Sequence, residues 1–166
     1  RQLASFHTQG NDAFIRYYTV NTSGTVTQFN LFTMQGVEAQ SFFPHESGAP
    51  TTSAYATFAT NSAFGFRVDS EWSEDSRNTI PAGSTTDQGH HVRFFVAKDE
   101  SGNVIPDAYI MVMDYSGINY DYNDNVYLIT NIKPLTPPNA PTALTAAPSG
   151  AGTQLDWADN TEANLG

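Results

Sequence analysis

Apolar and polar residues alternate with a period of two in several short stretches, which is the pattern of a half-buried β-strand. No stretch of the chain shows the longer periodicity of an amphipathic helix. The alternation predicts strands over residues 13–20, 25–33, 53–60, 64–68, 90–98, 108–114 and 126–132, and a loop over residues 35–50. The sequence therefore predicts an all-β fold, an antiparallel, jelly-roll-like β-sandwich over residues 1–133.

The strongest strands also predict which side chains form the hydrophobic core. Alternate positions on a strand face the same side of a sheet, and one face of each strand is more apolar than the other. The residues that we expect in the core are Val92, Phe94, Val96, Ile110, Val112, Val126 and Leu128.

Composition supports a β-rich globular protein. The 166 residues are 39% hydrophobic and 13% aromatic, enough to bury a core. Their many Thr, Ser, Asn, Tyr and Phe residues suit a pleated surface better than a helix.

Charge and cysteine content exclude several kinds of partner and site. The formal net charge of −10 disfavours nucleic acid and anionic membrane surfaces, and it is compatible with divalent cations and neutral glycans. No apolar run is long enough for a membrane-spanning helix. The chain has no cysteine, which excludes disulfides and thiolate metal sites. It opens on Arg1 without a methionine or signal peptide, so we expect a piece of a processed or longer protein.

The connection between the last two predicted strands of the sandwich is rich in Asp and Asn. Many oxygen donors in one loop are typical of a calcium site. The first carboxylate, Asp114, falls on the same face as apolar residues, where an unpaired charge is costly. We expect calcium ligands from Asp114, Asp121, Asn123 and Asp124, completed by Asp69 or Asp75 from a second acidic cluster.

Two alternatives to this calcium site remain open. The loop is not an EF-hand, because Val126 stands where that motif needs glycine and Ile132 where it needs glutamate. The Asp and Asn side chains of the loop could instead cap their own backbone, as in ordinary turns. The second acidic cluster, residues 69–78, could equally be a solvated loop face paired with Arg67 and Arg77.

Aromatic residues near the two acidic segments are candidates for stacking on a sugar ring. Tyrosine and tryptophan offer a flat apolar face and a polar edge, which suit the two-sided chemistry of a glycan. The candidates are Trp72, Tyr115, Tyr120 and Tyr122, although any of them could instead be a core side chain. His90 and His91 are adjacent on a strand and point to opposite faces, so we expect one at the core edge and one in solvent rather than a shared metal.

Part of the chain resembles a known but uncharacterised module. The residues that carry the likeness are Phe64-Gly65-Phe66, Ser73 to Asn78, His90 to Arg93, Gly102 to Asp107, Met113-Asp114-Tyr115 and Tyr120 to Tyr127. They resemble a β-sandwich module of secreted bacterial proteins, found beside malectin-like, immunoglobulin-like and fibronectin type III modules. A more distant likeness is to a bacterial surface module whose Asp-rich turn is taken to bind calcium. The resemblance covers about residues 63–134 and implies an extracellular or cell-surface accessory role.

The composition changes after residue 133. Residues 134–141 contain four prolines and predict a stiff, extended linker. Residues 142–166 resemble the opening of a fibronectin type III domain, with Trp157 at the position of its core tryptophan. About 25 residues are far short of the roughly 100 that such a sandwich needs. We therefore expect only an N-terminal fragment of that domain here.

The sequence favours a binding module over an enzyme. It has no nucleophile, phosphate-loop or metal-hydrolase motif, and Glu71 and Glu74 are too close in sequence to flank a glycosidase cleft. We expect a non-catalytic, calcium-stabilised, carbohydrate-binding module with a glycan and neighbouring domains as partners. The alternative is a structural or adhesive module of a surface protein or filament without a sugar site.

Overall fold

The computed structural model describes residues 1–8, 10–84, 87–118, 120–135, 142–149 and 152–158. These residues form two compact units, one from Arg1 to Lys133 and one from Pro134 to Leu165. The first unit is an antiparallel β-sandwich, and no α-helix occurs in the described part of the chain.

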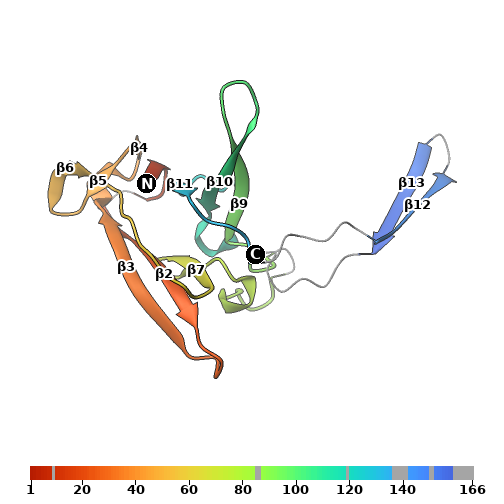
Figure 1. Ribbon diagram of the computed structural model, residues 1–166, viewed down its shortest axis with the longest axis horizontal. Coiled ribbons are helices and arrows are strands. Elements are labelled where there is room, and N and C mark those ends of the chain that lie inside the picture. Colours follow the sequence, from red (N-terminus) through yellow and green to blue (C-terminus); the bar gives the residue numbers. More distant parts are fainter. Residues whose placement is uncertain (9, 85–86, 119, 136–141, 150–151, 159–166) are drawn as a thin grey trace. The chain divides into compact units, whose positions relative to one another are not determined.

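One layer of the sandwich is a five-stranded sheet (Figure 1). Every neighbouring pair in it is antiparallel. Its strands, in spatial order, are β4 (Ser41–Phe42), β1 (Gln2–Ser5), β11 (Asn125–Thr130), β10 (Val104–Met113) and β9 (Val92–Lys98).

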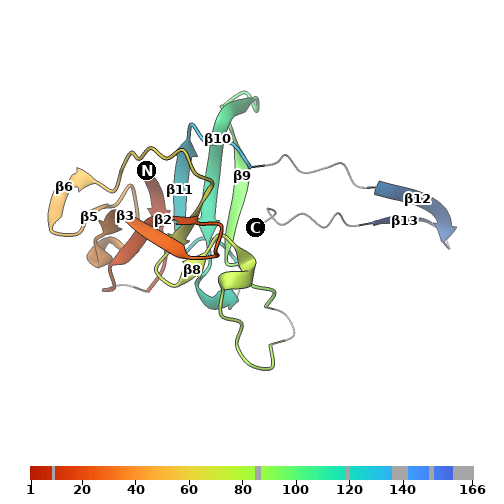
Figure 2. The same cartoon turned by 60° about the horizontal axis from the view of Figure 1, so that its bottom comes forward.

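The other layer is a six-stranded sheet that faces the first, as the turned view in Figure 2 shows. Its neighbouring strands are also antiparallel. In spatial order they are β6 (Ala49–Ser53), β5 (His45–Glu46), β3 (Val26–Met34), β2 (Ala13–Val20), β7 (Phe64–Val68) and β8 (Glu71–Trp72). Three short 3-10 turns complete the unit: η1 (Gly36–Glu38), η2 (Asp75–Arg77) and η3 (Tyr115–Gly117).

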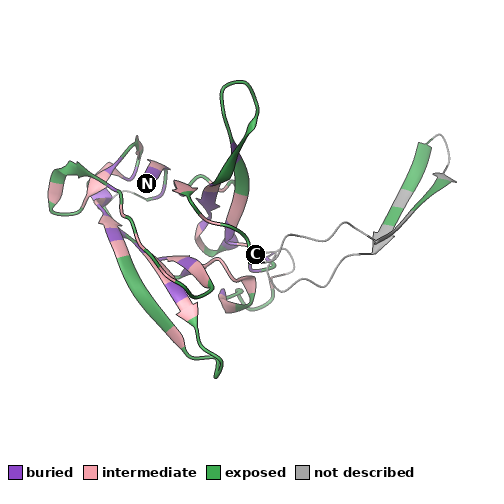
Figure 3. Ribbon diagram, viewed as in Figure 1, coloured by how far each residue is buried: buried purple, intermediate pink, exposed green. Residues whose placement is uncertain are grey.

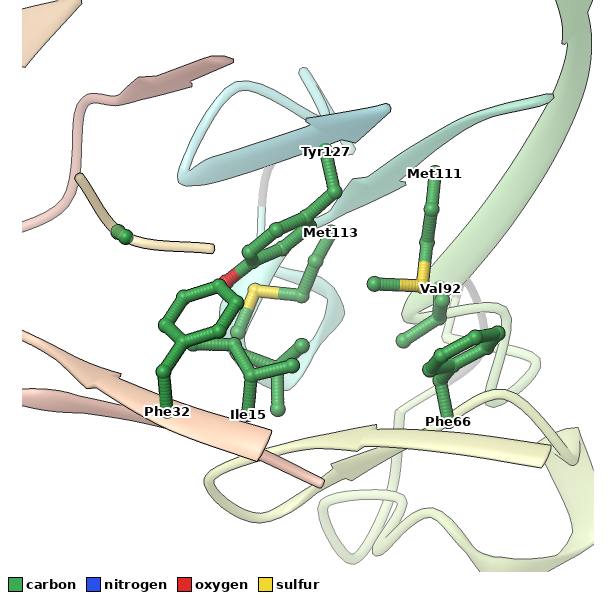
Figure 4. Close-up of a cluster of buried hydrophobic side chains, with 9 residues drawn as sticks. Ile15, Phe32, Phe66, Val92, Met111, Met113 and Tyr127 are labelled. Carbon is green, nitrogen blue, oxygen red and sulfur yellow. The ribbon is translucent and has the colours of Figure 1, made fainter. Parts of the chain in front are cut away.

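Side chains from both sheets meet in one hydrophobic core (Figure 4). The six-stranded sheet contributes residues such as Ile15, Phe32 and Phe66, and the five-stranded sheet contributes Met113 and Tyr127. Buried positions lie along the strands of both sheets, and the tips of the β2–β3 and β9–β10 hairpins are exposed (Figure 3). The core side chains come from the faces that the two sheets turn toward each other. These inner faces define the interior, and the opposite faces are called outer below.

The structure corrects the expected core on β10 and β11. Met111 and Met113 point into the interior, whereas Ile110 and Val112 lie on the outer face, paired with Leu128 and Val126 across the register. Val112 is nevertheless buried, as expected, although it lies outside the main core cluster, and the other three are only partly buried. Val92 is fully buried and Phe94 packs against the core as expected. The prediction for Val96 is wrong: this residue is 50% exposed, on the edge strand β9 opposite Tyr109 of β10. The alternation of branched aliphatic residues predicted that one face of β10 and β11 forms the core. In the structure the core cluster includes Met111, Met113 and Tyr127 from the opposite face.

Most strand predictions hold, and the main exceptions lie at the start of the chain and between residues 35 and 60. The expected strand over 53–60 is wrong: β6 ends at Ser53, and the backbone of Ala54 bonds instead to Pro44 and Gln2, linking different parts of the sandwich. The expected loop over 35–50 contains the short strands β4 and β5, which are too short to show alternation. Strand β1 was also missed.

The second unit contains a two-stranded antiparallel sheet of β12 (Thr142–Ser149) and β13 (Gly152–Ala158). Trp157 lies in β13. The expected linker falls mostly on residues 136–141, outside the described residues. The fibronectin type III assignment stays a prediction.

Candidate functional site

Asp114, the first predicted calcium ligand, follows β10 directly and is fully buried. Its carboxylate accepts hydrogen bonds from the backbone N–H groups of Ile118 at 3.1 Å and Asp121 at 3.2 Å. Burial raises the pKa of Asp114, and the nearby Asp121 charge adds to the effect. The buried carboxylate on this face thus folds the loop that follows it, by capping backbone N–H groups.

The other loop carboxylates have similar contacts. Asp124 accepts a hydrogen bond from the Tyr115 N–H at 2.7 Å, and burial followed by the charges of Asp114 and Asp121 raises the pKa of Asp124. The structure therefore brings Asp114, Asp121 and Asp124 close enough to repel one another. Asp121 and Asn123 are exposed, and an Asp121 oxygen lies 3.4 Å from the Asn123 N–H.

The two acids from the second cluster go to different places. Asp69 joins the loop region indirectly: it accepts hydrogen bonds from the Tyr115 hydroxyl and from the Phe14 N–H. Asp75 instead pairs with His90. Among the described residues, no group of three or more His, Asp and Glu side chains is placed to hold a metal. Calcium binding by this loop stays a prediction.

A buried acid–histidine cluster lies beside the loop, and the sequence analysis missed it. Both ring nitrogens of His91 contact carboxylates, Nδ1 the one on Glu71 and Nε2 the one on Asp87 at 3.0 Å. Tyr120 donates its hydroxyl hydrogen to Asp87 at 2.7 Å. His91 is fully buried, and Glu71 and Asp87 are 4% and 8% exposed.

This cluster connects three segments rather than presenting a reactive group. Glu71 belongs to β8, His91 precedes β9, and Tyr120 belongs to the Asp-rich loop. Burial alone would raise the pKa of Asp87, but hydrogen bonds from Tyr120, the Gly89 N–H and His91 outweigh it and hold that pKa below its usual range. Since both His91 nitrogens are occupied, the ring has none left for a substrate.

The predicted stacking residues are all partly buried, and each is held by the fold. Tyr115, Tyr120 and Tyr122 direct their hydroxyls to Asp69, Asp87 and the backbone oxygen of His90. Trp72 packs edge-on against Tyr18 with 5.0 Å between ring centroids. The three tyrosines lie in or beside the loop, and Trp72 lies on the six-stranded sheet, so the structure separates the candidates into two places.

A row of side chains crosses the outer face of the six-stranded sheet around Trp72. The register pairs Asn30 with Arg16, Arg16 with Arg67, and Arg67 with Trp72, so that β3, β2, β7 and β8 each contribute one residue. Residues opposite each other in a sheet share a face. With about 4.8 Å between strands, the row is about 14 Å long. We call these four residues the arginine row.

Beside the arginine row, the ring of Tyr18 packs over Gly65. Tyr18 pairs with Gly65 across β2 and β7, and a Cβ at position 65 would lie only 2.4 Å from the Tyr18 ring. The glycine therefore lets the ring lie flat on the sheet, where it is almost fully buried. Arg67 covers Trp72 at 4.4 Å, so the neighbouring side chains hold each other in place.

The two arginines are positioned by amides rather than by acids. The Arg16 Nε–H donates to Asn30 at 2.9 Å, and an Arg67 Nη1–H donates to Gln28 at 2.8 Å. In the described part of the chain, no ion pair involves either guanidinium. Burial and the neighbouring charge of Arg16 lower the pKa of Arg67, and the charges of Asp69 and Glu71 oppose this shift only in part.

Sequence signals for these features were incomplete or absent. The parity of β2 and β7 places Arg16 and Arg67 on polar faces, but only the register shows that they are opposite each other. The buried histidine cluster had no local signal, because Glu71 lies 20 residues before His91 and Asp87 lies in a segment with the composition of a plain loop.

Comparison with known proteins found no match to this chain among family models, curated proteins or solved structures. The described residues include no helix with the length and hydropathy needed to cross a membrane.

Proposed function

We propose that the Arg1–Lys133 unit is a non-catalytic, carbohydrate-binding accessory module of an extracellular or cell-surface protein, and that the glycan lies along the arginine row. The observation that supports this is the register of Asn30, Arg16, Arg67 and Trp72 across four neighbouring strands. It creates a flat strip of hydrogen-bonding groups that ends at an indole ring. Sugars combine hydroxyl edges with apolar ring faces, which such a strip matches.

This proposal keeps Trp72 and moves the site away from the tyrosines of the loop. The hydroxyls of Tyr115, Tyr120 and Tyr122 are already engaged within the fold. Asn30 and Gln28 are exposed, so their amides can reach a ligand above the sheet.

Binding of the full chain to an array of neutral and acidic polysaccharides tests the proposal. We expect binding that the double substitution Asn30→Ala, Gln28→Ala weakens. Thr27→Ala is the matched control, because Thr27 is exposed on the same strand but has the parity of the opposite face. Absence of binding to every glycan, or binding that the double variant leaves unchanged, would contradict the proposal.

A structural or adhesive module is the second candidate function. On the outer face of the five-stranded sheet, Phe42, Ala4, Val126 and Val112 follow one another across β4, β1, β11 and β10, and Arg93 of β9 ends the row. Ala4 and Val112 are buried, so the largely exposed apolar residue of this row is Phe42 at the sheet edge. Phe42 is 69% exposed. Such a face suits packing against a neighbouring domain of a surface protein. Phe42→Ser should then weaken association with that domain and leave glycan binding intact.

Calcium stabilisation and a fibronectin type III neighbour belong to the same proposal. Mutual repulsion of Asp114, Asp121 and Asp124 supports the first, since a divalent cation would relieve it. The antiparallel pairing of β12 and β13 is consistent with the first two strands of a fibronectin type III domain.

A further inference from the structure

We propose that the ligand of the arginine row is an acidic polysaccharide, and that a carboxylate of a uronic acid residue binds between Arg16 and Arg67. This inference rests on the proposed function and adds the chemical class of the glycan. It differs from what the overall charge favours, because the −10 of the whole chain is compatible with neutral sugars.

The first argument is the position of two like charges. Arg16 and Arg67 are directly opposite each other on adjacent strands, an arrangement that destabilises a sheet. The chain has 17 acidic and only 7 basic residues, yet no described carboxylate forms an ion pair with either guanidinium. The charges of Asp69 and Glu71 offset part of this repulsion at Arg67, and an anion from outside the chain that contacts both guanidinium groups would relieve the rest.

The second argument is the supply of unused donors. A guanidinium has five N–H donors in a planar fork that matches a carboxylate. In the described part of the chain, Arg16 uses only its Nε–H and Arg67 only one Nη1–H, so further Nη donors of both side chains remain for a ligand. The Arg67 Nε–H is buried without a hydrogen-bond partner and is not among the donors that a ligand can reach. Because Gln28 and Trp72 fix the guanidinium of Arg67 in place, little side-chain entropy remains to be lost on binding.

The third argument selects an acidic glycan over nucleic acid. Double-stranded DNA carries a charge about every 1.7 Å and needs many cations, whereas the row offers two. The surrounding net charge of −10 repels such a dense polyanion. A polysaccharide with at most one carboxylate per sugar places its charge at the arginines and its hydroxyls and ring faces at Asn30 and Trp72.

The test compares two polymers that differ only in charge. Polygalacturonate and its fully methyl-esterified form are titrated calorimetrically into the full chain in a calcium-free buffer. We expect the charged polymer to bind at least about tenfold more tightly, the minimum for a lost charge-assisted contact. Binding should weaken as sodium chloride is raised, because the contact is ionic.

Variants locate the contact. Arg16→Gln and Arg67→Gln should each reduce affinity for polygalacturonate about tenfold, and Arg67→Lys should restore only part of it because an ammonium lacks the planar fork. Lys98→Gln is the matched control: it removes the same charge from an exposed position on β9.

Each outcome is informative. Equal binding of the two polymers, or binding only to neutral glycans, overturns the acidic ligand and leaves the proposed carbohydrate function standing. An effect of Lys98→Gln as large as that of the row variants, or equally tight binding to duplex DNA, overturns the inference in favour of non-specific polyanion attraction. Failure to bind any polysaccharide overturns both proposals.

Discussion

Gly117 occupies a position where a single added carbon atom would disturb the buried histidine cluster. Its φ is +55°, and a Cβ would lie 2.8 Å from the Tyr120 hydroxyl and 2.9 Å from both Asp87 Oδ1 and His91 Nε2. We expect Gly117→Ala to lower the free energy of unfolding by about 3 kcal/mol, the sum of a left-handed backbone cost and displaced polar contacts. Urea denaturation measures this loss.

Gly102→Ala separates the two causes. Gly102 has a φ of +84°, but a Cβ there meets nothing within 4 Å. It should therefore cost only the backbone contribution, about 1 kcal/mol. Equal losses in the two variants would mean that the space above His91 is not restrictive.

Asp87 gives the cluster a defined pH dependence. The folded-state pKa of Asp87 is lowered, so its contribution to stability is present above the unfolded-state pKa of about 3.9 and is lost as the pH falls through the folded-state value. We expect Asp87→Asn to cost about 2 kcal/mol at pH 7, the scale of hydrogen bonds to a charged group. That difference from the parent should shrink below about pH 4.

Denaturation at a series of pH values checks this prediction. Glu100→Gln is the control, because Glu100 is exposed in the turn after β9 and its replacement changes only the net charge. A destabilisation by Asp87→Asn that is the same at pH 3 and pH 7 would contradict the role of its charge.

At the scale of elements, the orientation of β10 distinguishes the observed interior from the expected one. Met111 is fully buried in the core, whereas Ile110 is half-buried on the outer face. Met111→Ala should cost about 3 kcal/mol in unfolding free energy, as for other large-to-small core substitutions, and Ile110→Ala less than half of that. A larger loss of unfolding free energy for Ile110→Ala than for Met111→Ala would mean that the Ile110 face of β10 packs in the core, as the sequence pattern predicted.

The reason for that error is that β10 is apolar on both faces. Alternation identified the strand, but residues 110–113 are Ile, Met, Val and Met, so period two could not choose a side. The choice follows from packing against Ile15 and Phe32 of the other sheet, which no local pattern contains. The sandwich class and most strands were thus predictable, and the pairing of the sheets was not.

The same limit applies to the sites. Sequence identified the Asp-rich loop because its signal is local. The arginine row and the His91 cluster combine residues from separate strands and loops, and only the fold brings these together.

Measurements of thermal stability can test the predicted binding of calcium by the Asp-rich loop. If calcium binds this loop as predicted, the ion at 100 times its dissociation constant should stabilise the folded unit by about 2.7 kcal/mol, since such a site would form only on folding. Thermal melting in chelator and in millimolar calcium measures the change, with magnesium as the control ion. The double substitution Asp121→Ala, Asp124→Ala should abolish the increase; an unchanged melting temperature in the parent would leave the loop as an Asx-capped turn.

At the scale of the whole molecule, the distribution of charge matters more than its sum. Three of the seven cationic residues, Arg16, Arg67 and Arg77, belong to the six-stranded sheet or the turn beside it. A sequence-wide net charge averages this local concentration away. The net charge of the whole chain is compatible with a neutral glycan, whereas the local concentration of arginines on the six-stranded sheet favours an acidic one.

The pairing of β1 with β11 has a mechanical consequence. The Arg1 and Leu128 backbones exchange hydrogen bonds at 3.0 and 2.8 Å, so the start of the first strand lies beside the later part of the last one. Tension applied at residues 1 and 133 would separate these strands from that end and break their hydrogen bonds one after another rather than all together. We expect the sandwich to yield at lower force from these attachment points than from residues 20 and 98, a difference that single-molecule pulling would measure. Opening one hydrogen bond at a time would make the unit extensible at low tension.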